Sequence, residues 1–113
     1  MDPLSRLTVE AQDGNPLNID FYDTKKAAMI LRALNNKLRQ LIIKTVYENR
    51  NITVTELFIK LRIEQSVASQ HLSILKKAGI VSTLRAGKYV HYSVNTTRLE
   101  YISQFAKNLV INK

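Results

Sequence analysis

The sequence predicts a mainly α-helical fold with one small β-hairpin, in the order α-α-α-α-β-β-α. Apolar residues recur at helical spacing in several segments, and two of these segments are separated by a turn of about three or four residues, as in a helix-turn-helix. A run rich in β-branched and aromatic residues then surrounds a glycine and indicates a hairpin. Together these observations predict a winged helix-turn-helix, in which the hairpin is the wing.

The chain begins with a stretch that we expect to form an arm, residues 1–22, because both prolines and an Asp-Gly-Asn run lie there without sustained periodicity. A short helix around Leu4 to Ala11 stays open as an alternative. The folded domain is expected at 23–111. Asp23 is expected to cap a first helix at 24–35, and Asn36 a second helix that closes before Glu48. The inward residues of the second helix are expected to be Leu38, Leu41, Ile42 and Val46.

The helix-turn-helix itself is predicted from residue 53 onward. Thr53 and Glu56 have the spacing of a capping box, in which each side chain satisfies a free backbone amide at a helix start. The third helix is expected to follow, with Leu57, Phe58 and Leu61 facing inward. A fourth helix is expected from Gln65 to Ala78, with Gly79 as its left-handed cap.

The hairpin is predicted over Ile80–Val94, with its turn around Gly87. Asn95 and Thr96 offer caps for a last amphipathic helix. The first and last helices are more apolar than so small a core requires, which predicts dimerisation through them. The residues expected at the dimer interface are Ile30, Leu31, Leu99, Ile102, Phe105 and Leu109.

Composition narrows the class of partner and of chemistry. The 113 residues carry a net charge of +8, which suits nucleic acid or an acidic membrane surface. There is no cysteine, which removes thiolate metal sites and thiol chemistry, and we find no glycine-rich phosphate loop or paired carboxylates. We therefore expect no enzyme and no cofactor. No apolar run is long enough to span a membrane, so a cytoplasmic protein is expected.

The fourth helix carries a polar face opposite its apolar stripe of Ala68, Leu72, Leu75 and Ala78. Glutamine can pair with an adenine edge, serine can bond to base or phosphate, and lysine can meet phosphates. The alternative is an ordinary solvated face. Because the turn, the hairpin and the charge agree, we interpret this face as reading double-stranded DNA, through Gln65, Ser66, Ser69, Gln70, Ser73, Lys76 and Lys77. Arg85 and Lys88 at the wing tip are expected to contact the backbone or minor groove, although charged hairpins also serve solubility.

The run Gln65–Val81, followed by Arg85, Gly87, Lys88 and Tyr92, resembles the ArsR family of bacterial regulators. Upstream, Arg39 occupies a position where that family commonly has arginine. The resemblance spans about residues 24–110, and its specific part is Ser69–Val81. It implies a dimeric repressor that recognises a roughly palindromic operator and releases it when an inducer binds. The resemblance also favours a DNA contact for His71. The alternative is that His71 packs at the boundary of the core with one ring nitrogen bonded to the backbone.

Two departures from the family pattern matter. The family often has glycine in the turn and Ser or Asp as the cap, whereas this chain has Arg62 and Glu64. Many relatives sense metals through cysteines on the third helix or through Asp and His on the last helix, and these ligands do not appear here, so no metal is expected. His91 is interpreted as a strand surface residue. The inducer is left open among a small organic molecule, a partner protein and none.

The alternative function is a winged-helix module that binds proteins, or that binds nucleic acid without sequence preference, through the same basic surface. A discrete, palindromic protected site on DNA separates a sequence-specific regulator from that alternative.

Overall fold

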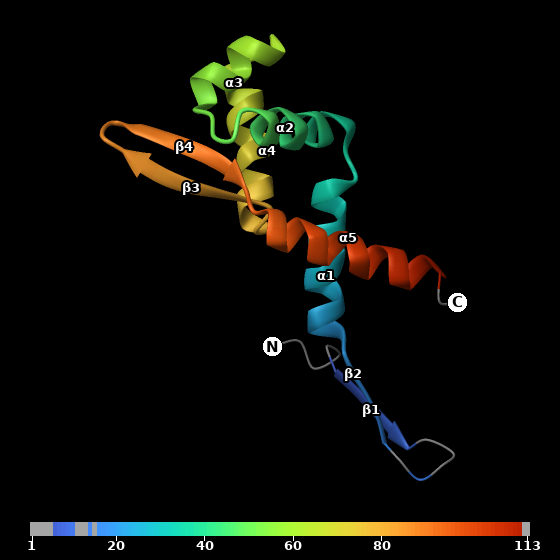
Figure 1. The fold of residues 1–113 in the computed structure, drawn as a ribbon. Coiled ribbons are helices and arrows are strands. Elements are labelled where there is room, and N and C mark those ends of the chain that lie inside the picture. Colours follow the sequence, from blue (N-terminus) through green and yellow to red (C-terminus); the bar gives the residue numbers. More distant parts are fainter. Residues whose placement is uncertain (1–5, 11–13, 15, 112–113) are drawn as a thin grey trace. The chain divides into compact units, whose positions relative to one another are not determined.

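The computed structural model describes residues 6–10, 14 and 16–111, and its chain divides into two compact units, Met1–Arg32 and Ala33–Lys113. The predicted set of helices and the wing hairpin is present, so the mainly α fold with a small hairpin is confirmed (Figure 1). Two further strands precede the helices. The element order is therefore β1-β2-α1-α2-α3-α4-β3-β4-α5.

The first unit contains an antiparallel hairpin that the sequence analysis did not predict. Strands β1 (Arg6–Glu10) and β2 (Pro16–Asp20) pair in register, with Arg6 opposite Asp20. A helix around Leu4 to Ala11 is therefore wrong for Arg6–Glu10, while Leu4, Ser5 and Ala11 lie outside the described residues. Apolar and polar residues alternate along both strands in sequence, which is the strand period.

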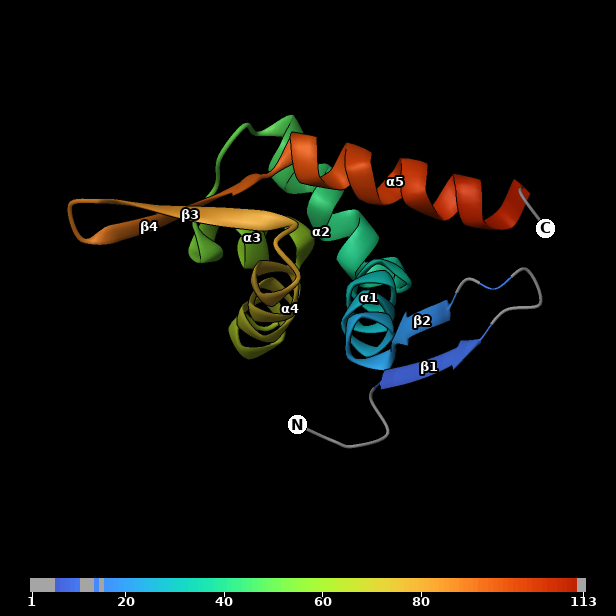
Figure 2. The ribbon, with the colours of Figure 1, turned by 90° about the horizontal axis from the view of Figure 1, so that it is seen from below.

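Strand β2 runs directly into helix α1 (Phe21–Leu34), which begins three residues earlier than the predicted start at residue 24 (Figure 2). Asp20 caps this helix, because its Oδ1 accepts from the amide of Tyr22 at 2.9 Å. Asp23 instead lies in the first turn, where a carboxylate is favourable beside the positive end of the helix dipole. The predicted cap at Asp23 is wrong by one turn.

The second unit begins with helices α2 (Lys37–Glu48) and α3 (Val54–Leu61). The predicted caps are confirmed: Asn36 Oδ1 accepts from the amide of Arg39, and Thr53 and Glu56 form the reciprocal capping box. One inward residue was predicted wrongly, since Leu41 is 45% exposed. Thr45 is buried on α2 instead, and its hydroxyl donates to the Leu41 carbonyl at 2.8 Å, which satisfies a polar group in the core.

Helix α4 (Gln65–Lys77) and the strands β3 (Val81–Ala86) and β4 (Tyr89–Val94) follow, and then helix α5 (Thr96–Ile111). Helix α4 packs against α2, α3 and β3, while β4 packs against α2 and α3. The hairpin extends away from these helices with its turn at the far end (Figures 1 and 2). The largest fully buried side chains form one core contributed by α2, α3, α4 and the start of the hairpin: Ile42, Val46, Leu57, Leu72, Leu75 and Ile80.

None of the helices in the described part of the chain combines the length and apolar character that crossing a membrane requires.

Candidate nucleic-acid interface

Helix α4 presents one covered side and one open side. Ala68, Leu72 and Leu75 are fully buried and Ala78 is 2% exposed, as the spacing predicted. The polar residues predicted to read DNA are all exposed, which places them on one uninterrupted surface of the helix: Gln65, Ser66, Ser69, Gln70, Ser73, Lys76 and Lys77. Because the buried stripe fixes the rotation of the helix about its axis, the direction of this polar face is fixed as well.

The two ends of α4 are also defined by local contacts. Glu64 is the N-cap residue in an extended conformation, and the amide of Ala68 donates to its carbonyl at 3.1 Å. At the other end, Gly79 has φ +76°, the left-handed conformation expected of a helix-ending glycine. Lys76 and Lys77 lie in the last turn, where cations oppose the negative end of the helix dipole.

The wing is a two-residue hairpin. Ala86 pairs with Tyr89, so Gly87 and Lys88 form the turn, and Gly87 has φ +64°, as the first central position of a type II′ turn requires. Arg85 and Lys88 are both exposed at this tip, as predicted. Arg85 Nε donates to the Gly87 carbonyl at 3.2 Å, and the Lys88 ammonium lies 5.5 Å from the centre of the Tyr89 ring. Two cations thus occupy the end of the hairpin.

The base of the wing is tied to the loop that precedes α3. Ile52 forms a bridge with Tyr92 through two backbone hydrogen bonds of 3.0 and 2.8 Å. Beside it, His91 Nδ1 and Asn51 Oδ1 are 3.0 Å apart. His91 is therefore half-buried and bonded, although the sequence indicated only a strand surface residue. These contacts join residues about forty positions apart and position the wing relative to the helix-turn-helix.

His71 lies on the covered side of α4, in the region of the buried stripe, three residues after Ala68 and four before Leu75. Its Nδ1 is 3.2 Å from Nη1 of Arg39, whose Nε donates to the Ala33 carbonyl at 2.7 Å. A guanidinium only donates, so Nδ1 must accept and the proton of the neutral ring lies on Nε2. Burial, and then the nearby Arg39 charge, lower the pKa of His71. This placement favours the boundary role of His71, with the Arg39 side chain and not the backbone as its partner.

The side chains predicted for dimerisation divide into covered and open ones. Ile102 is 5% exposed and is part of the core of the chain itself, and Leu99 is half-buried. Phe105 and Leu109 are 43% and 61% exposed on α5, and the same helix exposes further large apolar residues: Tyr101, Val110 and Ile111. On α1, Ile30 and Leu31 are half-buried while Met29 is 40% exposed. The sequence spacing did not single out Tyr101 or Met29.

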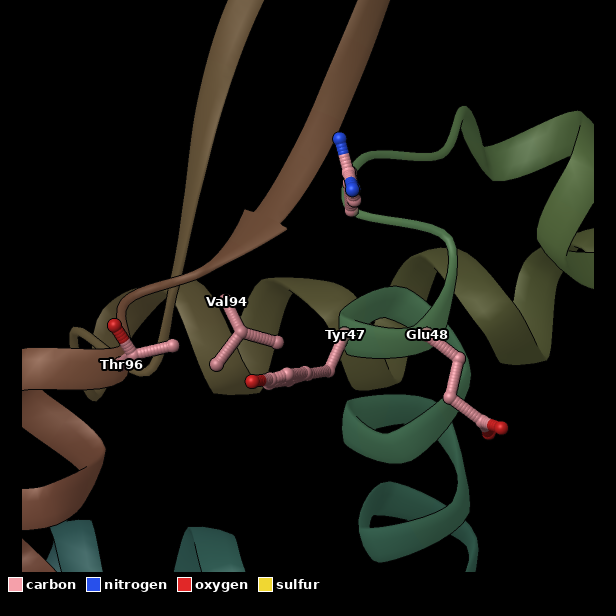
Figure 3. Close-up of a pocket in the computed structure, with 5 residues that line it drawn as sticks. Tyr47, Glu48, Val94 and Thr96 are labelled. Atoms are coloured by element: carbon pink, nitrogen blue, oxygen red, sulfur yellow. The ribbon is translucent and has the colours of Figure 1, made fainter.

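An open pocket of about 430 Å³ lies where the end of α2 faces the connection from β4 to α5. It is lined by Tyr47, Glu48, Arg50, Val94 and Thr96. Figure 3 shows the Tyr47 ring pointing toward Val94, while Glu48 points the other way. Among the described residues, no three His, Cys, Asp or Glu side chains gather closely enough to hold a metal ion.

A helix-turn-helix with an open polar second helix and a basic wing defines a DNA-binding protein of the winged-helix class. Comparison with known proteins refines this class. Residues 36–83 match the family model described as the bacterial regulatory protein, arsR family. An uncharacterised HTH-type transcriptional regulator of Methanocaldococcus jannaschii is 34% identical over 75% of this chain and 96% of its own length. The transcriptional activator HlyU of Vibrio cholerae is 30% identical over 85% of this chain and 90% of that protein.

Solved structures agree with the fold. An ArsR-like transcriptional regulator from Rhodococcus sp. RHA1 superposes with a TM-score of 0.70 at 16% identity, over 80% of this chain and 85% of that one. NolR from Sinorhizobium fredii gives 0.63 at 29% identity, over 76% and 86%. The chain belongs to the ArsR family, and it is a DNA-binding transcriptional regulator.

Proposed function

We propose that this regulator is a dimeric repressor that binds a roughly palindromic operator with two α4 helices and releases it when an inducer binds. The observation that carries the proposal is the division of α4 into a fully covered stripe and an uninterrupted exposed polar face. The choice of repression follows PagR of Bacillus anthracis, a transcriptional repressor that is 26% identical over 74% of this chain and 84% of its own length, whereas HlyU is a transcriptional activator.

In this proposal the side chains of α4 take different tasks according to their chemistry. Gln65 and Gln70 read base edges, since a side-chain amide can pair bidentately with adenine in the major groove. The serines bond to bases or phosphates, while Lys76 and Lys77 meet phosphates from the last turn. Arg85 and Lys88 at the wing tip contact the backbone or minor groove beside the same site.

Dimerisation is assigned to the apolar residues that the chain leaves open. Phe105 and Leu109 on α5 are large, exposed and one helical turn apart, and α1 contributes the half-buried Ile30 and Leu31. A monomer that exposes so many large apolar side chains on one helix gains by covering them with a second copy. Twofold symmetry then places the two α4 helices about 34–36 Å apart, one turn of DNA.

The decisive experiment selects bound duplexes from a random pool and measures the size of the protein in the same buffer. We expect a dimer, and a selected consensus of two inverted half-sites separated by about one helical turn. A protein that stays monomeric and retains all duplexes equally contradicts the proposal and favours a nonspecific module. Once the operator is selected, we expect the inducer, a small organic molecule or a partner protein, to release the protein from that duplex.

The role of Gln70 is tested with Gln70→Ala. We expect a loss of about 1–3 kcal/mol on the selected operator and relaxed preference at one base position, because one bidentate contact disappears. Gln104→Ala is the matched control, since Gln104 is an exposed glutamine on α5 that bonds to Asn108 at 2.9 Å. If Gln70→Ala weakens all duplexes by the same factor, Gln70 does not read a base.

A further inference from the structure

Two arginines adopt a backbone conformation that normally favours glycine. Among the residues that the structure describes, Arg50 and Arg62 are the non-glycine residues with positive φ, at 64° and 56°. A residue with a Cβ is strained in this left-handed region, whereas glycine enters it freely. Side chains that persist at such positions are candidates for a functional task.

Arg62 lies at the turn of the helix-turn-helix. It is the C-cap residue of α3, where its amide donates to the Ile59 carbonyl at 3.3 Å, and α4 begins at Gln65. Its side chain is exposed, and its guanidinium makes no hydrogen bond or ion pair within the described part of the chain. An open cation with five donors thus lies beside the first turn of the helix that carries the polar face.

We propose that Arg62 is a further DNA contact, which binds a phosphate of the operator beside the N-terminal end of α4. The inference rests on the proposed function, because it needs α4 to lie in the major groove. The forked guanidinium matches the geometry of a phosphate, and phosphate contacts at the edge of the groove hold a reading helix in register. Glycine at this position relieves the backbone strain but removes the phosphate ligand.

The size of the effect follows from counterion release. Each phosphate neutralised contributes about 0.9 to the slope of log K against log salt concentration. At about 0.15 M salt this corresponds to roughly fivefold in affinity per contact. A dimer makes the contact twice, so loss of both arginines should lower affinity about 30-fold and reduce the slope by about 1.8.

The experiment compares Arg62→Gly with Arg62→Gln by fluorescence anisotropy on a duplex of about 30 base pairs, over a salt series, together with thermal unfolding. Both variants should bind about 30-fold more weakly than wild type, and the slope should fall by about 1.8. Arg62→Gly should also unfold at a higher temperature than wild type, because its strain is removed, while Arg62→Gln should not. A more stable protein that binds DNA less well cannot be explained by damage to the fold.

Two controls make the result specific. Arg62→Lys keeps the charge and should keep the wild-type slope. Arg50→Gly removes the same charge from the same backbone conformation on the loop before α3, and it should raise the unfolding temperature without changing the slope. An unchanged slope in Arg62→Gln, or an equal fall in Arg50→Gly, overturns the assignment. The slope of log K against log salt concentration can also be measured on a duplex of random sequence. Failure to select an operator therefore contradicts the proposed function but leaves the Arg62 contact testable.

Discussion

Gly79 joins the end of α4 to the first strand of the wing, and its replacement by alanine should destabilise the fold by a predictable amount. At φ +76° a side chain with a Cβ costs about 1–2 kcal/mol. Alanine also lowers the conformational entropy of the unfolded chain, which stabilises the folded state by about 0.4–1 kcal/mol and offsets part of this cost. The new Cβ would also lie 3.2 Å from Nε of Arg98, a flexible side chain that can shift by a few tenths of an ångström. We therefore expect Gly79→Ala to lower the free energy of unfolding by about 1 kcal/mol.

Urea and thermal unfolding measure this change, and about 1 kcal/mol corresponds to a decrease in Tm of roughly 4–8 °C for a domain of this size. Gly87→Ala adds a Cβ with no atom within 4 Å, so its loss is conformational alone. The part of the Gly79→Ala loss that comes from Arg98 should disappear in an Arg98→Ala background. If Gly79→Ala is as stable as wild type, the left-handed end of α4 is not required and the reasoning fails.

Three further predictions concern the wing tip, the core side of α4 and the capping box. Lys88→Gln should weaken binding to all duplexes alike and lower the slope of log K against log salt concentration by about 0.9 per subunit. Fluorescence anisotropy measures this slope, with Lys107→Gln as the control variant. An unchanged slope in Lys88→Gln would show that Lys88 does not contact DNA. Because the folded state lowers the pKa of His71, the unfolded state binds the proton more readily. Stability measured by urea unfolding should thus fall as pH drops through about 6.5, and less so in His71→Asn. Thr53→Ala should cost about 1 kcal/mol in unfolding experiments, whereas Thr55→Ala should not.

The helices of the second unit could be predicted because their signals are local. Asn36, the Thr53–Glu56 pair and Gly79 each satisfy or end a helix within a few residues, and the structure uses all of them as predicted. The buried stripe of α4 likewise follows from the helical period alone. Leu41 shows the limit of this reasoning: it belongs to the apolar pattern but is 45% exposed, whereas the polar Thr45 is buried with its hydroxyl bonded to a backbone carbonyl.

The N-terminal hairpin was missed although its signal is present. Residues 6–10 and 16–20 both alternate between polar and apolar positions, but each run has only five residues. Pro16 and the Asp-Gly-Asn run favoured an irregular segment, whereas a proline at the first residue of a strand is compatible with pairing.

The contacts that position the candidate interface could not be predicted from sequence, because they join distant residues. Arg39 and His71 are 32 positions apart, and Asn51 and His91 are 40 apart. The packing of α2 on α4 gives His71 its partner, and the packing of the wing on the loop before α3 gives His91 its partner. The polar face and the wing tip were predictable because exposure follows from periodicity and turn chemistry.

The two sides of α4 therefore carry different kinds of information. Its covered side, with Leu72, Leu75 and the His71–Arg39 contact, determines where the helix lies relative to α2 and hence in which direction its polar face points. In the proposed function its open side, with Gln70 and the serines, reads the bases once the helix is in place. A change on the covered side shifts every contact at once and lowers affinity for all sequences, whereas a change on the open side alters one contact and changes preference at one position. The rank order of duplexes bound by a variant, and not its affinity alone, thus distinguishes a residue that positions α4 from one that reads a base.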